Sequence, residues 1–208
     1  MNISKFLLID AVLVIAAIPL LFFVSGGKRK SPFLRSSSKE ELLRKASGKL
    51  PDKEKLRELE KFSKEKGSGI EFDSILGIWK FISIWKKDID EEDPIFSSLL
   101  RVFSAKIEFK KDLLTKNSTE LSVIASIQFG LFSIGFSGTG YLKGKQPLLP
   151  FCLNLIELKA GSNILLRRSL KEPEDKEKSF FAMIALEEND ELLSARGQGG
   201  EVVIWLKD

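Results

Sequence analysis

The 208-residue sequence contains no histidine, a single cysteine (Cys152) and a single tyrosine (Tyr141). Histidine is the most frequent proton-transfer side chain near neutral pH and the commonest metal ligand. One cysteine can form neither an internal disulfide nor a zinc site built from several cysteines. We therefore expect a protein that is not an enzyme and that has no metal site and no cofactor.

The net charge is only +4, but the charge is unevenly distributed along the chain. Residues 28–66 hold 14 Lys and Arg against 7 Asp and Glu, whereas residues 67–208 hold 18 against 21. The basic excess thus belongs to the segment near the N-terminus, and the body that follows is slightly acidic. A body that binds nucleic acid should carry a basic face of its own, so we expect no nucleic acid among the partners.

One long apolar run, FLLIDAVLVIAAIPLLFFV, occupies residues 6–24. Nineteen residues at about 1.5 Å each in a helix approach the roughly 30 Å hydrocarbon core of a bilayer. Four Lys and Arg residues follow within residues 28–35, whereas only Lys5 and the α-amine precede the run. The alternative is a cleaved signal peptide. The basic flank favours an uncleaved transmembrane anchor over residues 1–27, with the body on the cytoplasmic or stromal side.

Residues 28–70 form a predicted basic juxtamembrane and helical segment. Its first part is either a solvated linker that sets the topology or a contact with anionic lipid headgroups. Residues 38–41 (SKEE) match a capping box for a first short helix. Pro-Asp at residues 51–52 opens a second helix, which Gly67 ends. We expect that helix to lie against the body through a narrow apolar stripe of Leu56, Leu59 and Phe62.

Residues 75–86 (ILGIWKFISIWK) are rich in the β-branched and aromatic side chains that favour strands. Successive side chains of a strand point to opposite faces, and both faces of this strand are apolar. We expect one face of this strand to point into the interior of a barrel and the other to lie under the helical residues 39–64. The first set includes Trp79, Phe81 and Trp85, and the second includes Ile78, Ile82 and Ile84.

From residue 71 to residue 208 the pattern is mostly β, with alternating apolar and polar residues separated by turn signals. At Gly130 the parity of the alternation reverses, which predicts a tight turn or a glycine bulge. We count eight or nine antiparallel strands with no helix between them. They favour an up-and-down barrel with room for one small ligand, and a two-sheet sandwich is the alternative.

Two motifs carry a resemblance to a known family. Residues 76–79 (LGIW) open the first strand, and residues 196–200 (RGQGG) precede the last apolar strand. Together with the helical segment before them, they resemble the plastid-lipid-associated proteins, or plastid fibrillins, whose fold is lipocalin-like. The order and spacing agree along residues 39–208. A membrane helix is not a general feature of that family, so the expected anchor rests on residues 6–24 alone.

The resemblance implies association with lipids and small hydrophobic molecules, such as a quinone, a carotenoid or an acyl lipid, at a photosynthetic membrane such as the thylakoid. Roles in photoprotection are attached to the family, and no agreed catalytic residues come with it. The sequence therefore predicts a membrane-anchored barrel that binds or carries an apolar molecule. The alternative is a non-catalytic scaffold or assembly factor for a membrane-protein complex, with a solid barrel core; an isomerase or lyase is a distant third.

The resemblance also implies a structural pair, because in lipocalin-like barrels a Trp of the first strand packs near an Arg of the last. Here these would be Trp79 and Arg196, whose guanidinium would lie over the indole. Arg167 and Arg168 either meet an anionic headgroup or lie in solvent. Six phenylalanines either line an apolar ligand pocket or simply fill a core: Phe81, Phe103, Phe109, Phe129, Phe136 and Phe151.

Overall fold

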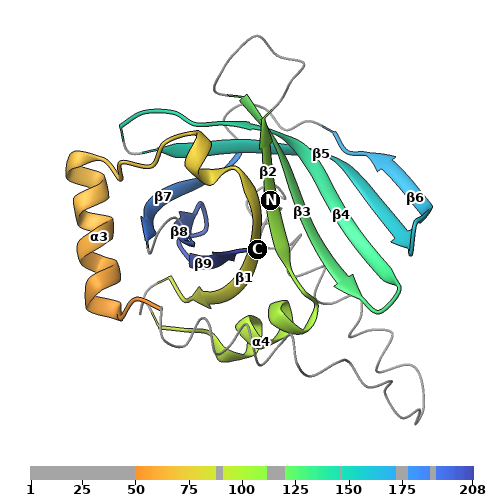
Figure 1. Ribbon diagram of the computed structural model, residues 1–208, viewed down its shortest axis with the longest axis horizontal. Helices are drawn as coiled ribbons and strands as arrows, with labels where there is room; N and C mark the ends of the chain where they lie inside the picture. The colour runs from red at the N-terminus through yellow and green to blue at the C-terminus, as the bar shows by residue number, and fades with distance from the viewer. Residues whose placement is uncertain (1–49, 88–90, 112–119, 146, 172–177, 188–190) are drawn as a thin grey trace, which may run out of the picture.

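A computed structural model of the chain shows a mostly β protein with two α-helices in the part that it describes (Figure 1). The predicted anchor over residues 6–24 and the first short helix lie outside that part. No helix among the described residues is both long and apolar enough to cross a membrane. The described residues are 50–87, 91–111, 120–145, 147–171, 178–187 and 191–208.

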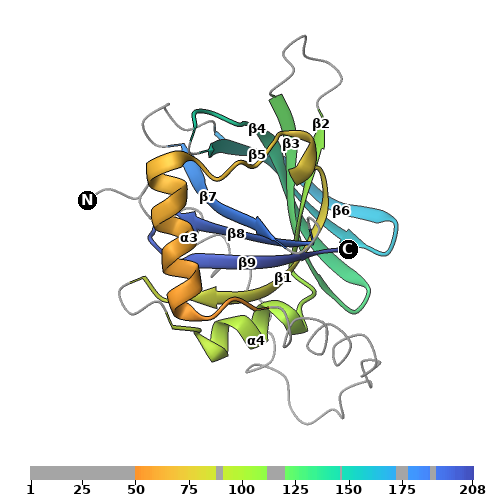
Figure 2. The same ribbon diagram turned by 60° about the vertical axis from the view of Figure 1, so that its left-hand side comes forward.

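Nine antiparallel strands form a single sheet that closes into a ring (Figures 1 and 2). The order is β4-β3-β2-β1-β9-β8-β7-β5-β6, and β4 also pairs with β5, so that eight strands complete the ring and β6 is added outside it. The prediction of an antiparallel sheet of eight or nine strands is confirmed. The strands are β1 (Gly77–Trp85), β2 (Lys106–Lys111), β3 (Glu120–Phe129), β4 (Phe132–Tyr141), β5 (Leu148–Ala160), β6 (Asn163–Ser169), β7 (Ser179–Glu187), β8 (Leu192–Gly197) and β9 (Val202–Lys207).

The long strand β5 has two different neighbours on one edge. Residues 148–151 pair with β7 and complete the ring, whereas residues 155–160 pair with β6. The ends of β3, β4 and β5 therefore continue past the ring together with β6, on the side opposite helix α3 (Lys53–Lys66) (Figure 1). We call this extension the wing and define it as residues 124–137 and 155–169.

Helix α3 lies across the outer face of the ring (Figure 2). Asp52 caps its first turn by accepting from the Lys55 backbone N–H at 2.7 Å, and Gly67 ends it at φ +95°, as predicted. Leu56 packs in one cluster with Ile82 of β1. The expected contact between the helical segment and the outward face of β1 is thus confirmed for Ile82, whereas Ile84, expected on the same face, packs against the interior cluster.

The predicted apolar stripe of α3 is partly wrong. Leu56 is buried, but Phe62 is 55% exposed, and the polar Glu60 and Ser63 are buried in its place. The Ser63 hydroxyl donates to the Met183 backbone oxygen of β7 at 2.9 Å. The helix thus turns Glu60 and Ser63, and not Phe62, toward the sheet, where both form hydrogen bonds. The spacing of hydrophobic residues alone does not reveal this orientation.

A bulge in β1 reverses the predicted facing of Trp85. The pairing of β1 with β9 shifts between Phe81 and Ser83. Trp79 and Phe81 therefore belong to the interior cluster, whereas Trp85 lies in the outer cluster under α3. One extra residue in a strand moves every later side chain to the other face.

A second helix, α4 (Pro94–Val102), lies between β1 and β2, so the prediction of no helix between the strands is wrong. Asp93 accepts from the backbone N–H groups of Ile95 and Phe96 at 3.2 and 3.1 Å, and proline follows at the first helical position, where it is favoured. Phe103, one of the six candidate phenylalanines, is the residue that ends this helix. The Asp93-Pro94 pair is thus a helix-start signal that the strand pattern alone does not take into account.

Candidate functional site

The centre of the ring is occupied by packed side chains. Three of the six candidate phenylalanines, Phe81, Phe109 and Phe151, are buried there together with Trp79. The ring of Phe151 stacks on Phe181 with centroids 5.2 Å apart. Aromatic pairs of this kind stabilise a core beyond their buried area. These three phenylalanines thus fill the core, which was the second of the two expected roles.

Trp79 is completely buried and its indole N–H donates to the Ile75 backbone oxygen at 2.7 Å. The cation over its ring is Lys207, whose Nζ lies 5.2 Å from the ring centroid. Lys207 lies directly opposite Trp79 in the pairing of β1 with β9. A Trp of the first strand therefore does meet a cation of the last strand, but that cation is a lysine.

The predicted pair of Trp79 and Arg196 is wrong, because Arg196 points to the outer face of the sheet. Its neighbour Ala195 belongs to the interior cluster, and successive residues of a strand face opposite sides. Two nitrogens of the Arg196 guanidinium donate to the two carboxylate oxygens of Glu60 on α3, at 2.8 and 2.5 Å. Arg196 thus fixes the helix to the ring.

The Glu60 carboxylate is nearly buried, and burial by itself raises the pKa of a carboxyl group. Hydrogen bonds from Arg196 and Lys64 act in the opposite direction and outweigh burial, so the pKa of Glu60 lies below its ordinary value of 4.5. The carboxylate is therefore charged at neutral pH. The contacts of Glu60 with Arg196 join α3 to β8.

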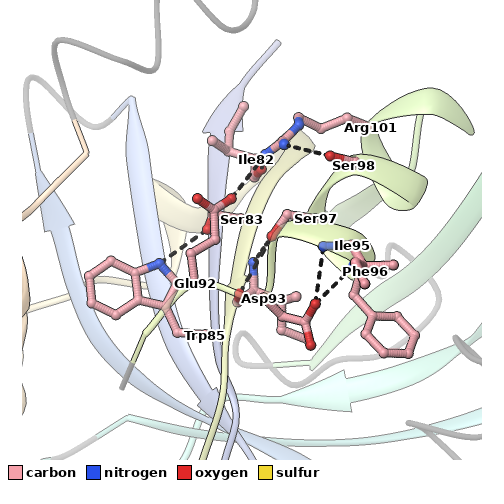
Figure 3. Close-up of polar contacts among 11 residues, drawn as sticks. Ile82, Ser83, Trp85, Glu92, Asp93, Ile95, Phe96, Ser97, Ser98 and Arg101 are labelled. Carbon is pink, nitrogen blue, oxygen red and sulfur yellow. Dashed lines mark hydrogen bonds and ion pairs between the residues drawn. The ribbon is translucent and has the colours of Figure 1, made fainter. Parts of the chain in front are cut away.

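Helix α4 is fixed to the β1 bulge by polar contacts that sequence analysis missed (Figure 3). Arg101 donates to the backbone oxygen of Ile82, the residue that the bulge leaves out of the ladder, at 2.6 Å. The Ser97 hydroxyl accepts from the Ile84 backbone N–H at 3.0 Å. These contacts hold α4 at the base of the wing.

The remaining three candidate phenylalanines come together where α4 meets the wing. Phe103 and Phe136 are buried in a separate cluster with Ile127. Phe129 contacts Phe103 edge to face, with centroids 5.7 Å apart, but it is 42% exposed. The structure thus separates the six phenylalanines into an interior set of three and a wing set of three.

The wing has one apolar face, as the strand register shows. Phe129 pairs with Phe132, and two residues along the same face Ile127 pairs with Ile134. Across β5 this row continues through Leu158 to Leu166 of β6. The row and the neighbouring pair of Phe129 and Phe132 together extend the apolar surface outward from the buried cluster of Phe103.

The opposite face of the wing is polar. Glu157 accepts from Arg167 at 2.7 Å and pairs with Lys159 at 3.0 Å. Hydrogen bonds from Lys159 and Arg167 lower the pKa of Glu157. The wing is therefore an amphipathic sheet, with the Glu157 cluster on one side and a surface on the other that is hydrophobic apart from Arg168. Such a surface can hold a flat or flexible apolar molecule.

A hollow also lies along α3, and none of the six candidate phenylalanines lines it. It has a volume of about 280 Å³ and is lined by charged side chains, among them Glu60 and Lys64 of the cluster described above; the full set is Arg57, Glu60, Lys61, Lys64 and Glu65. A charged lining does not suit an apolar ligand, because ligand pockets for such molecules are mainly hydrophobic. The wing, and not this hollow, is the candidate site.

Comparisons with known proteins give no identification: no family model matches the chain, and a search of curated proteins found no significant match.

Proposed function

We propose that this protein is a membrane-anchored, non-catalytic lipid-associated protein that binds or carries a small hydrophobic molecule, such as a quinone, carotenoid or acyl lipid, at a photosynthetic membrane. Residues 6–24 would be the anchor, with the body on the cytoplasmic or stromal side. The ligand class and the membrane are those that the resemblance to the plastid fibrillins implies.

The exposed apolar face of the wing is the observation that carries this proposal. The interior of the ring is filled by large side chains such as Trp79 and Phe109. The wing, by contrast, offers Phe129 and Phe132 half exposed beside a buried aromatic cluster. An apolar molecule lying there would bury surface at about 25 cal/mol per Å².

The same proposal includes the finer description of the fold as a lipocalin-like, up-and-down barrel. It is supported by the pairing of the first strand, β1, with the last, β9, and by the pairing of β4 with β5, which closes the ring. A departure from a simple meander is the insertion of β6 between β5 and β7 in the chain.

The packed interior favours a second candidate, a non-catalytic scaffold or assembly factor for a membrane-protein complex. A ring with a solid core needs no ligand to be stable, and its outer surfaces then serve only to contact proteins. The two functions differ in whether a lipophile should co-purify with the protein.

The test is extraction of the purified full chain, in mild detergent, followed by mass spectrometry of the organic phase. We expect a lipophile to co-purify, and we expect Phe129→Gln to weaken its binding about tenfold, since one aromatic contact is lost. Phe62→Gln is the matched control, because Phe62 is 55% exposed but lies on α3, outside the wing.

Repeated absence of any bound or titratable lipophile in the wild-type protein would favour the scaffold. An equal loss with Phe129→Gln and Phe62→Gln would show that the wing is not the binding surface. Circular dichroism of the three proteins checks that both substitutions leave the fold intact, as expected at exposed positions.

A further inference from the structure

Exposed apolar side chains of the described residues are concentrated at one place in the fold. Ten large hydrophobic residues are exposed, and six of them belong to the wing. The tip of the β3–β4 hairpin is the extreme case, because Leu131 in its turn is 78% exposed. Soluble surfaces rarely gather apolar side chains in this way without a partner. The six are Phe129, Leu131, Phe132, Ile164, Leu165 and Leu166. A register shift places Ile164 opposite Lys159, on the polar face, whereas Phe129, Phe132 and Leu166 lie on the apolar face.

The charge of the wing is positive. Its two segments hold Lys159, Arg167 and Arg168 against the single carboxylate of Glu157, a net charge of +2. Arg167 is on the polar face, where it is paired with Glu157. Arg168 lies opposite Ile156 in the register, two residues from Leu166 and hence on the apolar face, and it is exposed.

We infer that the apolar face of the wing docks on an anionic bilayer, with the β3–β4 hairpin tip entering the interface and Arg168 contacting lipid phosphates. Aromatic and aliphatic side chains beside cations suit the headgroup region of a membrane, and anionic lipids attract basic residues near the surface. This inference deepens the proposed function: it names the surface through which a lipophile would pass between bilayer and protein.

A second copy of the chain suits this surface less well than a bilayer does. Two copies that met through β6 or through the apolar face would bring two positively charged wings together, and like charges at an interface oppose association. An anionic bilayer removes that repulsion. The segment after the expected anchor also allows the contact, since residues 25–37, before the expected short helix, span up to about 40 Å when extended.

The experiment uses the full chain reconstituted into vesicles of phosphatidylcholine with about one-third phosphatidylserine, with acyl chains that carry bromine. Bromine quenches a tryptophan only where the indole reaches the hydrocarbon region. Leu131→Trp places such a reporter at the wing tip. Phe62→Trp is the matched control, since Phe62 is also exposed but lies on α3, on the side of the ring opposite the wing (Figure 1). The wild-type protein supplies the baseline.

We expect quenching at position 131 in these vesicles and only the wild-type baseline at position 62. Adding Arg168→Gln to Leu131→Trp should lower the docking equilibrium about fivefold, the effect of one basic residue near an anionic surface. Omitting phosphatidylserine should weaken quenching in the same direction. Equal quenching at both reporters, or none at position 131, would overturn the inference.

Two further measurements separate the alternatives. Disulfide cross-linking of Leu131→Cys between chains, with no quenching of Leu131→Trp, would assign the wing to a second copy and overturn bilayer docking. Alkaline extraction of the same vesicles tests the anchor by itself. An embedded protein with an unquenched tip refutes only the wing inference. A quenched tip in protein that alkali releases supports the wing and contradicts the proposed anchor.

Discussion

Glu60 shows how one carboxylate fixes a helix to a sheet. It is nearly buried, and a charge taken out of water is stabilised only when partners replace its hydration. Arg196 supplies two parallel hydrogen bonds, the geometry in which a guanidinium holds a carboxylate most specifically. The pair therefore joins α3 to β8 with a fixed geometry, beside the apolar contact of Leu56.

Glu60→Gln should lower the free energy of unfolding by about 1–3 kcal/mol at neutral pH, because charged hydrogen bonds become neutral ones. The pKa of Glu60 is depressed in the folded state, so its contribution is present above the ordinary value of 4.5 and is lost as the pH falls through the folded value. The difference between wild type and variant should therefore shrink at acid pH.

Urea unfolding of the full chain in mild detergent, followed by circular dichroism at several pH values, measures this difference. Glu58→Gln is the control, since Glu58 is an exposed carboxylate of the same helix. A gap between wild type and Glu60→Gln that persists unchanged below the ordinary pKa would contradict the expected linkage.

The pairing of β4 with β5 depends on a glycine. Gly138 lies where the register of the two strands shifts, and a Cβ added there would lie 1.8 Å from the Cys152 backbone oxygen. The obstacle is backbone, which cannot rotate away as a side chain can. The approach of these two strands, and with it the closure of the ring, therefore requires glycine at this position.

Gly138→Ala should destabilise the protein by about 1–3 kcal/mol, as overpacking does when backbone must move. Gly135→Ala, in the same strand, is the matched control, because an added Cβ there meets nothing within 4 Å. Thermal unfolding of both variants decides the matter. Equal melting temperatures for the two would show that closure at β4–β5 tolerates a side chain.

Helix α4 and the β1 bulge illustrate a coupling that local pattern does not show. The bulge frees the Ile82 carbonyl, and Arg101, nineteen residues later, satisfies it. A strand with an unbroken alternation would present Trp85 to the interior, where Trp79 and Phe81 already lie. Because of the bulge, Trp79 and Phe81 pack in the interior cluster and Trp85 packs in the outer cluster.

The molecule combines a closed ring with a sheet that continues beyond it. Closure removes the edges that invite strand pairing, but β6 restores one edge, on the side opposite α3 (Figure 2). The helix and the wing thus occupy opposite sides of the ring. On one side, the Glu60–Arg196 pair holds α3 against the ring. On the other side, the wing exposes the apolar surface on which both proposals rest.

The expected anchor gives a prediction for the whole chain. Deleting residues 2–27 should move the protein from the alkali-resistant membrane fraction to the supernatant, because the 19-residue apolar run would no longer span the bilayer. Immunoblots of fractionated cells report the distribution. Retention of the shortened chain in the alkali-resistant fraction would mean that residues 6–24 do not hold it there.

Sequence alone determined the approximate number of strands and the caps of α3, because alternation, capping residues and turn residues act over a few positions. The neighbourhood of the first and last strands was implied by the resemblance and not by local pattern, and the order in the sheet departs from the expected meander because β6 lies outside β5. Sequence alone did not determine which cation meets Trp79, which face Trp85 takes, or the existence of α4. Those depend on a one-residue bulge and on contacts between residues far apart in the chain. The wing is a further example. The sequence shows its apolar residues, but only the pairing of β5 with both β7 and β6 places them outside the ring.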